Sequence, residues 1–452
     1  MTATSINPTP ADALAATPLR RRRIAVVVLG DVTRSPRMRY HASALAAADV
    51  EVDLVGYKGR ESECDVSAQS KIHCHFLPKP LPTARYRRTG VLFLLTSLIR
   101  IVLQSARLFW CLVWTLPAPD TILVQCPPAI PTLLVVLVAA RLRGAQLVID
   151  WHNFGYAMLA LALGQSHPIV TLARWYEGSV GRCAQAHLCV SRAMQTMLAQ
   201  QWGISATVLH DLPAQRFAPT PLPVRRELFR RLATPLTAAS LLYDPSALDR
   251  PALIVSATSW TVDEDFSLLL AAVVRCDSLI GTYDSECPHR PFPHLLIVIT
   301  GDGPLRARYE QRIRQLSLRK IYLCTLWLSA DDYALLLGAA DLGLCLHRSA
   351  SGVDLPMKIA DMFGAGIPVC ALDYGPCLSE LVRHGENGVL FANDEQLARS
   401  LCELFREFPS RSALLDQLRW KVQHQPRERW DEAWARVARP IILADERAAA
   451  VV

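Results

Sequence analysis

The segment Asp341–Val369 of this 452-residue chain reads DLGLCLHRSASGVDLPMKIADMFGAGIPV. It begins as an apolar run of strand length, breaks at the small residues Ser349–Gly352, and continues as a helical segment that ends at Gly364 and Gly366. A loop of small residues that leads into a helix N-terminus presents backbone N–H groups and a partial positive charge, which suit a phosphate group. A carboxylate in the helix can also accept hydrogen bonds from ribose hydroxyls. The segment therefore predicts a strand–loop–helix unit that holds a nucleotide diphosphate.

The same alternation of strands and helices extends over most of the chain. Apolar runs of strand length, separated by helical lengths, lie at 24–29, 50–55, 121–124, 145–150, 186–190, 253–257, 295–300, 321–324, 342–346 and 367–372. Strands spaced by helices in this way indicate parallel α/β sheets. We therefore expect two Rossmann-like, doubly wound domains that face a central cleft, where the carboxyl ends of the strands meet.

Composition suggests where the domains begin and end. Four prolines between Pro213 and Pro223 mark a linker. The expected division is a disordered tail at 1–22, an N-terminal domain facing acceptor and membrane at 23–212, a linker and variable stretch at 213–250, a donor-binding domain at 251–425, and a C-terminal helix and tail at 426–452.

Charge and hydropathy favour an anionic membrane or a phosphate-bearing substrate. Hydrophobic residues make up 51% of the chain and the net charge is +7. The excess lies in residues 1–150, which hold 18 Lys or Arg and 10 Asp or Glu. The basic residues are scattered and form no recognised nucleic-acid module, so no nucleic-acid partner is expected.

Cysteine usage points to a reducing, cytosol-facing location. The 13 cysteines form no Cys-x-x-Cys pair, and most lie in apolar runs where free cysteine behaves as a small core residue. The triplet His73–His75 lacks further ligands at useful spacing. No metal site is therefore expected.

A membrane-associated helix is expected at Val91–Leu116. Residues 1–19 have the composition of neither a signal peptide nor an anchor. The helix is long enough to span a bilayer, but Arg100, Gln104 and Arg107 fall on one face. We expect it to lie in the membrane interface, with a helix packed inside the domain and a spanning helix as open alternatives.

Polar clusters follow five of the predicted strands, at the edge of the sheet where such folds bind ligands. They are Gly30–Arg37, Asp150–Asn153, Ser256–Trp260 with the acidic residues 263–265, Gly301–Pro304, and the loop that contains His347. Each has a simpler explanation, such as an N-capped turn at Asp31, a core histidine at 152, or acidic residues that favour a first helical turn. Five clusters in two domains are harder to attribute to chance than any one of them.

These clusters carry a resemblance to a known family. GDVTRSPRMRYHA, VIDWHNFGY, SATSWTVDEDF, ITGDGPL and LHRSASGVDLPMKIADMFGAGIPV, spread over residues 23–408, resemble the chitobiosyldiphosphodolichol β-mannosyltransferase family. DLPMKIADMFG together with DWHNFGY separates this family from the broader glycosyltransferase superfamily, in which a Glu-x7-Glu pattern is more common. Asp361 stands in the place of the second Glu, and residues 1–23 lack the family's usual hydrophobic anchor.

The resemblance implies a GT-B fold and an inverting β1,4 transfer of mannose. GDP-mannose would be the donor and GlcNAc2-diphosphate-dolichol, the dolichyl-diphosphate chitobiose, the acceptor. The enzyme would work at the endoplasmic reticulum membrane with its active site on the cytosolic face, where other dolichol-pathway mannosyltransferases are candidate partners. No cofactor is required, and stimulation by a divalent cation is compatible with this chemistry.

Roles for individual residues follow as hypotheses. Asp31 is expected to be the catalytic base, with His152 as the alternative, because the strand ends face the cleft. Arg34 and Arg37 are candidates for the acceptor diphosphate. Donor contacts are expected from Ser259, Trp260, Gly301, Gly303, His347, Ser351, Gly352, Asp354, Lys358 and Asp361.

Two other functions fit parts of the pattern. One is another transferase of the same fold that uses GDP-mannose later in the assembly of the lipid-linked glycan. The other is a non-catalytic membrane subunit that recruits a transferase. Intact clusters on both the acceptor and the donor side favour an enzyme over a scaffold.

Overall fold

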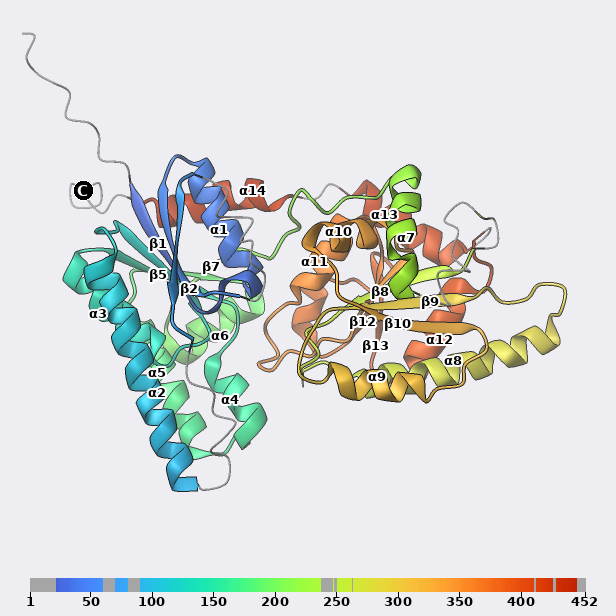
Figure 1. Ribbon diagram of the computed structural model, residues 1–452, viewed down its shortest axis with the longest axis horizontal. Coiled ribbons are helices and arrows are strands. Elements are labelled where there is room, and N and C mark those ends of the chain that lie inside the picture. The colour runs from blue at the N-terminus through green and yellow to red at the C-terminus, as the bar shows by residue number, and fades with distance from the viewer. Residues whose placement is uncertain are drawn as a thin grey trace, which may run out of the picture.

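The chain folds into two α/β domains (Figure 1). The computed structural model describes residues 22–59, 70–79, 90–236, 247, 250–261, 263–409, 412–425 and 428–444. Each domain holds one parallel sheet that is covered on both faces. Alternate residues of β1 (Arg23–Asp31), for example, enter two different apolar clusters, one on each side of the sheet. The predicted pair of Rossmann-like domains is therefore confirmed.

The N-terminal sheet has seven parallel strands in the order β3–β2–β1–β4–β5–β6–β7. The further strands are β2 Glu51–Tyr57, β3 Ile72–Leu77, β4 Thr121–Cys126, β5 Gln146–Trp151, β6 Ala186–Cys189 and β7 Thr207–Val208. Its helices are α1 Pro36–Ala47, α2 Gly90–Trp110, α3 Thr132–Arg143, α4 Gly155–Leu163, α5 Pro168–Gly181 and α6 Arg192–Trp202. Helix α6 is capped at both ends, since the Ser191 hydroxyl accepts from the Met194 N–H and Gly203 ends the helix in a left-handed conformation.

The C-terminal sheet has six parallel strands in the order β10–β9–β8–β11–β12–β13, the strand order of a dinucleotide-binding fold. They are β8 Ala252–Ala257, β9 Leu295–Thr300, β10 Ile321–Leu326, β11 Leu342–Cys345, β12 Val369–Leu372 and β13 Gly388–Phe391. The helices are α8 Phe266–Glu286, α9 Arg306–Arg314, α10 Ala330–Ala339, α11 Met357–Gly364, α12 Asp394–Phe405 and α13 Ala413–His424.

Two segments connect the domains. The stretch expected to be a linker contains α7 (Leu222–Leu236), whose Leu228, Phe229 and Leu232 are buried against the C-terminal domain. The C-terminal helices α14 (Trp430–Ala433) and α15 (Arg439–Ile442) return to the N-terminal domain, where the segment between them, Trp434–Ala438, packs against α1; α14 is labelled in Figure 1. The chain therefore crosses between the domains twice.

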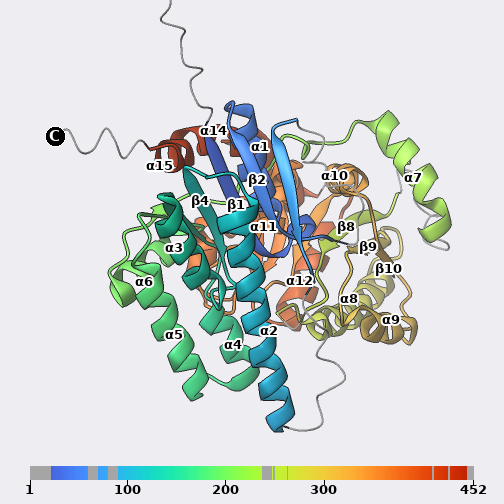
Figure 2. The same ribbon diagram turned by 60° about the vertical axis from the view of Figure 1, so that its left-hand side comes forward.

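Helices α2, α4 and α5 extend together beyond one end of the N-terminal sheet (Figures 1 and 2). Among the residues that the structure describes, two helices are long and apolar enough to cross a membrane: α8, in the C-terminal domain, and Thr96–Thr115, of which only 17% is buried. That exposure does not fit the alternative of a helix packed inside the domain.

Candidate active site

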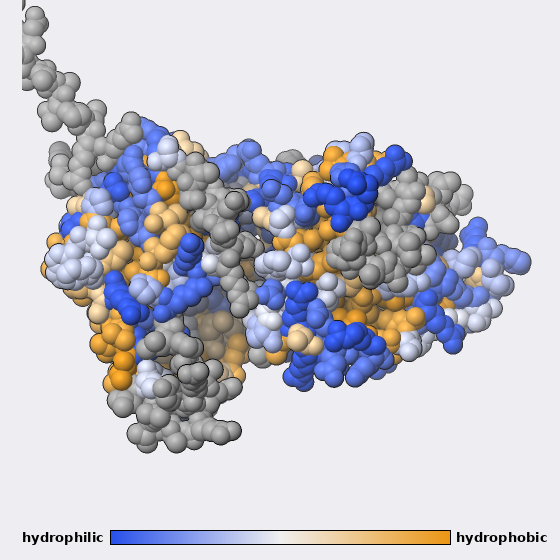
Figure 3. All heavy atoms as spheres, viewed as in Figure 1, coloured by the Kyte–Doolittle hydropathy of each residue, from blue (hydrophilic) through white to orange (hydrophobic). Residues whose placement is uncertain are grey.

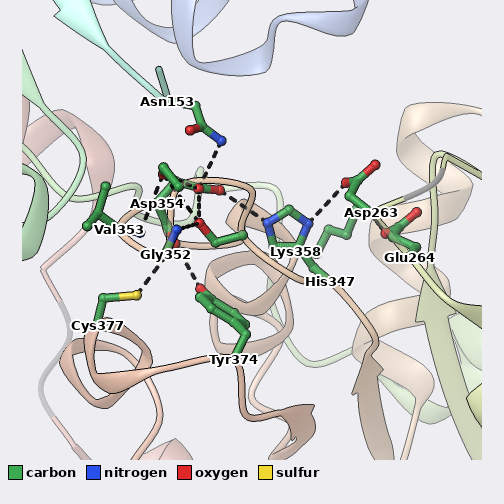
Figure 4. Close-up of polar contacts among 12 residues, drawn as sticks. Asn153, Asp263, Glu264, His347, Gly352, Val353, Asp354, Lys358, Tyr374 and Cys377 are labelled. Carbon is green, nitrogen blue, oxygen red and sulfur yellow. Dashed lines mark hydrogen bonds and ion pairs between the residues drawn. The ribbon is translucent and has the colours of Figure 1, made fainter. Parts of the chain in front are cut away.

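Asp354 is the centre of the loop that follows β11 (Figure 4). Its Oδ1 accepts hydrogen bonds from the Ser349 hydroxyl, the Ser351 hydroxyl at 3.2 Å and the Asn153 amide at 2.9 Å. Its backbone carbonyl accepts from the Tyr374 hydroxyl at 2.8 Å. The sequence places serines here because short hydroxyl side chains can close a tight loop on one carboxylate.

His347 lies between two carboxylates in the same site (Figure 4). Its Nε2 is 3.2 Å from Asp354 and its Nδ1 is 3.4 Å from Asp263. Burial alone would lower the pKa of His347, but the hydrogen bonds to Asp263 and Asp354 raise it to about 9. The same contact holds the pKa of Asp263 well below its usual range despite burial. His347 is therefore an imidazolium at neutral pH.

Glu264 anchors a third charged group. Its buried carboxylate pairs with the Lys358 ammonium and accepts from the Thr258 hydroxyl at 2.6 Å and the Ser259 N–H at 2.8 Å. Lys358, the expected diphosphate ligand, thus lies at the start of α11 beside His347, with a counter-ion already in place. Ser259 is exposed and close to this pair.

Gly301, Gly303 and Trp260 contribute to packing in the C-terminal domain, whereas the sequence predicted that they contact the donor. A Cβ on Gly301 would lie 1.8 Å from the Thr258 carbonyl oxygen, and one on Gly303 would lie 1.8 Å from that of Ser259. These glycines allow two loops to pack together rather than admitting the nucleoside. Trp260 is fully buried and stacks on Phe266, so it does not line the donor.

Gly352 also differs from expectation. Its φ of +76° suits glycine, but its N–H donates to the Ser349 hydroxyl at 2.8 Å and is not free for a phosphate in this arrangement. Ser351, whose hydroxyl reaches Asp354, lies at the surface of the same loop. The loop is therefore closed on itself around Asp354.

Asp361 lies one turn after Lys358 on α11. Burial and the nearby Asp211 raise its pKa well above the usual range, and Arg216 opposes this. Burial, and after it the negative charge of Asp361, raises the pKa of Tyr40 on α1. Among the hydrogen bonds of the described residues, none joins Asp361 to the Asp354–Lys358 cluster. Its expected contact with ribose hydroxyls stays a prediction.

On the N-terminal side, Asp150 organises a buried network at the end of β5. Arg37 forms a bidentate ion pair with Asp150, at 2.8 and 2.9 Å, and a further pair with Asp211 at 2.8 Å. His41 and His152 contact the same carboxylate at 3.2 and 2.9 Å. Although burial opposes it, Arg37 and His152 hold the pKa of Asp150 well below its usual range.

This network corrects the expectation for Arg37. Its side chain is fully buried, and Asp150, Asp211 and the Leu209 carbonyl occupy its donors. It cannot reach the diphosphate of a lipid acceptor without breaking these contacts. Arg34 ends the short turn Val32–Arg34 that precedes α1, and its side chain lies outside the described part of the structure.

The two candidate bases lie at the carboxyl edge of the N-terminal sheet. Asp31 caps the turn after β1, where its Oδ1 accepts from the Thr33 N–H at 3.0 Å and the Thr33 hydroxyl at 2.6 Å. It is only half-buried. His152 is also half-buried, and Asp150 fixes its Nε2. The N-capped turn expected as the simpler reading of Asp31 is present, and it leaves the carboxylate accessible.

Three contacts bring the two sides together. Asn153 of the N-terminal domain donates to Asp354, and the Ser191 hydroxyl donates to the Val353 carbonyl. Glu380 accepts from the N–H groups of Arg192 and Ala193 at 2.8 and 2.9 Å. The donor-side loop therefore faces the carboxyl ends of β5 and β6 across the domain boundary.

Sequence analysis overlooked several residues of this site. Asp263 and Glu264 were attributed to a first helical turn, but Asp265 alone caps α8, through its bond to the Ser267 N–H. Asn153 lay in a recognised cluster without a role. Within the described residues, no three His, Cys, Asp or Glu side chains are grouped so as to hold a metal ion.

Comparison with known proteins identifies the family. A model of the glycosyl transferase 4-like domain matches residues 34–215, and one of glycosyl transferases group 1 matches 275–407. The chain is 42% identical to the chitobiosyldiphosphodolichol β-mannosyltransferase of Mus musculus, covering 94% of this chain and 89% of the relative. The Homo sapiens protein of that name is also 42% identical, with 93% of each chain covered.

A third relative has a different name. UDP-glycosyltransferase TURAN of Arabidopsis thaliana is 42% identical, covering 94% of this chain and 97% of its own. Solved structures support the GT-B fold: WaaG, a glycosyltransferase of lipopolysaccharide biosynthesis, gives a TM-score of 0.58 at 15% identity, with 93% of this chain and all of WaaG covered. Anabaena HepE with UDP-glucose gives 0.59 at 15% identity, with 93% and 99% covered.

Proposed function

This chain belongs to the chitobiosyldiphosphodolichol β-mannosyltransferase family, and we propose from that premise that it transfers the first mannose to GlcNAc2-diphosphate-dolichol. The donor is GDP-mannose, and the reaction forms a β1,4 linkage by a single inverting displacement. The observation that carries the proposal is identity of about two residues in five over more than nine-tenths of this chain and at least 89% of each relative. It extends over both domains and both polar clusters.

The donor lies against the C-terminal domain. Lys358, the Ser351 hydroxyl and the N-terminus of α11 stabilise the diphosphate, since charge-assisted contacts of this kind contribute about 1.5–3 kcal/mol each. His347 and Asp354 lie at the domain boundary, where the transferred sugar must meet the acceptor. Exposed Ser259 borders the donor from β8.

The net charge of the cluster around His347 and Lys358 determines whether a divalent cation would favour binding of the donor diphosphate. His347 and Lys358 are balanced by three carboxylates: Asp263, Asp354 and Glu264. A diphosphate that approaches such a site gains when a cation such as Mg²⁺ accompanies it. We therefore propose that Mg²⁺ stimulates transfer without being required, so chelation should lower the rate severalfold and not abolish it.

The base deprotonates the acceptor hydroxyl as the bond to mannose forms. Asp31 is the proposed base, because its carboxylate is oriented by Thr33 and lies half-buried at the carboxyl end of β1. His152 instead orients the sugar, with Asp150 fixing its ring. Replacing Asp31 with Asn should lower the rate of transfer by about 10²–10⁴-fold. GDP affinity by calorimetry should stay nearly unchanged.

The comparison between the two bases decides the assignment. His152→Gln is expected to raise the acceptor KM with a smaller loss of kcat. If Asp31→Asn keeps wild-type rates while His152→Gln does not, His152 is the base.

The location follows from the lipid acceptor. We propose that the enzyme works on the cytosolic face of the endoplasmic reticulum membrane, where the apolar helices of the N-terminal domain contact lipid. Other mannosyltransferases that use the same lipid carrier are candidate partners.

Transfer itself is tested with the purified protein, labelled GDP-mannose and a chitobiosyl-diphosphate lipid. The expected product is a lipid-linked trisaccharide whose label β-mannosidase releases. Because one relative is named a UDP-glycosyltransferase, UDP-sugars are tested in parallel. Release by α-mannosidase, or transfer from a UDP-sugar alone, would contradict the proposal.

A further inference from the structure

A cavity of about 400 Å³ lies between α4, α5, α6 and the donor-side loop. Its walls include Tyr156, Gln165, Arg174, Met197, Gln201 and Ser351. The volume is in the range of small-molecule sites. One wall belongs to the loop built around Asp354, so the cavity opens next to the donor.

Helices α4 and α5, which line the cavity, also form a hairpin with an exposed apolar surface. Met158 and Leu161 of α4, and Leu172 and Trp175 of α5, are exposed large apolar side chains. The surface continues through α3, which packs against α5, and through α2, which packs against α3. Figure 3 shows apolar side chains gathered along α2. A surface of this kind suits the interface of a membrane.

Arg174 places a positive charge between these two regions. Its guanidinium lies over the Tyr156 ring, 5.5 Å from the centroid, and its side chain is exposed. No carboxylate within the described ranges forms an ion pair with it. Its neighbour Glu177 is buried and accepts from the Tyr156 N–H at 2.9 Å, so it fixes the start of α4 rather than neutralising Arg174.

We propose that this cavity is the acceptor subsite, in which Arg174 binds the diphosphate of a polyprenyl-linked disaccharide. The lipid chain leaves along the α4–α5 hairpin, and the two sugars extend past Tyr156 toward Ser351. An arginine fork matches diphosphate oxygens, and an aromatic ring suits a sugar face. The inference rests on the proposed transfer and assigns the contact that buried Arg37 cannot make.

The dimensions of the acceptor support this direction. The attacking hydroxyl is on the outer sugar, so two rings separate it from the diphosphate. The diphosphate must therefore bind away from the donor, on the side nearest the lipid. Arg174 meets both conditions, because its cavity extends from the apolar hairpin to the donor-side loop.

The test compares Arg174→Ala and Arg174→Lys with Arg182→Ala, which removes an arginine just beyond α5 and outside the cavity. The probe is chitobiosyl diphosphate on a short saturated isoprenoid chain, which needs no bilayer. Arg174→Ala should raise the acceptor KM and weaken its binding in calorimetry about tenfold to hundredfold. GDP affinity and the thermal unfolding midpoint should stay unchanged, Arg174→Lys should be intermediate, and Arg182→Ala should match wild type.

The binding measurement separates this inference from the proposed function. If the wild type binds the acceptor through Arg174 but forms no mannoside, the subsite stands and the proposed transfer fails. If Arg174→Ala binds the acceptor as tightly as wild type, the subsite assignment is wrong, whatever the protein transfers. An equal loss in Arg182→Ala would also overturn it, since it would indicate a general effect of positive charge.

Discussion

His347 is the residue whose charge bears most directly on the candidate site, because its imidazole lies between two carboxylates. Two carboxylates, Asp263 and Asp354, hold it in place and keep it protonated at neutral pH. A neutral amide at this position could bond to both but would leave the negative charges uncompensated. We therefore expect the site to depend on pH through this ring.

The first prediction is a loss of stability at alkaline pH. The pKa of His347 is about 9 in the folded protein, against 6.5 for an unperturbed histidine. Its ion pairs stabilise the folded state fully below about pH 6.5, and this stabilisation is lost as pH rises through 9. It amounts to a few kcal/mol at most. The unfolding midpoint of His347→Gln should therefore lie below that of wild type at pH 6 and approach it at pH 9.5. A constant difference would contradict this.

Arg37 gives a second prediction at the same scale. Replacement by Met leaves Asp150 and Asp211 without their cation in a buried site, which costs about 3–5 kcal/mol. Urea unfolding followed by tryptophan fluorescence should show this loss, because Trp430 stacks on the guanidinium at 5.3 Å. A variant with wild-type stability and a raised acceptor KM would restore the ligand role first expected for Arg37.

At the residue scale, the sequence predicted which residues share a loop, but it did not predict which distant residues their side chains contact. It placed His347, Asp354 and Lys358 in one loop–helix unit, because their spacing follows local backbone rules. It missed that Glu264 turns back to Lys358, 94 residues away. Arg37 was misread for the same reason, since its partners Asp150 and Asp211 lie far along the chain.

At the scale of elements, the central parallel strands and the edge strand β10 were predictable, whereas the edge strands β3, β7 and β13 were not. Central strands such as β9 are continuous apolar runs because both faces are covered. The edge strand β3 reads IHCHFL, and its His73 and His75 pair with Glu51 and Asp53 of β2. Because His73 and His75 alternate with less polar residues, this segment was considered as a metal motif and was not recognised as a strand.

The α4–α5 hairpin gives a third prediction. Replacing Leu161 and Leu172 together with Asp should reduce binding to vesicles containing anionic lipid at least tenfold, because two exposed apolar side chains lose their contact with lipid. Flotation of the vesicles measures this. Transfer to the short-chain acceptor should be kept. Leu222→Asp, an exposed position on α7, is the matched control and should float like wild type.

At the scale of the molecule, the domains are joined by polar contacts and by a crossing chain. The C-terminal segment returns to the N-terminal domain, where the Trp434 indole donates to His41 at 2.9 Å. A C-terminal helix was expected within residues 426–452, but nothing local in the sequence specifies which domain it covers. The Asp150 network and the linker are thus held beneath a segment from the far end of the chain.

Glu380, in the C-terminal domain, makes a second set of contacts with the N-terminal domain. Its carboxylate binds the first N–H groups of α6, where the helix dipole favours an anion, and pairs with His210 at 3.0 Å. Despite partial burial, His210 and these N–H groups lower the pKa of Glu380, so the contact stays ionised at neutral pH. This contact between the domains requires the start of α6 to lie against the turn after β12, which contains Glu380.

The fourth prediction follows from that dependence. Glu380→Ala removes three polar contacts between the domains, so the closed arrangement becomes less populated and the donor-side loop meets Asn153 less often. We expect kcat/KM for transfer to fall about tenfold to hundredfold, while GDP affinity, which depends on the C-terminal domain, changes little. Small-angle scattering should show a larger radius of gyration. Glu386→Ala removes a half-buried carboxylate six residues away, which pairs with Arg383 of its own turn at 3.6 Å, and should leave both quantities unchanged. An equal effect of the two variants would mean that charge, and not domain closure, governs the rate.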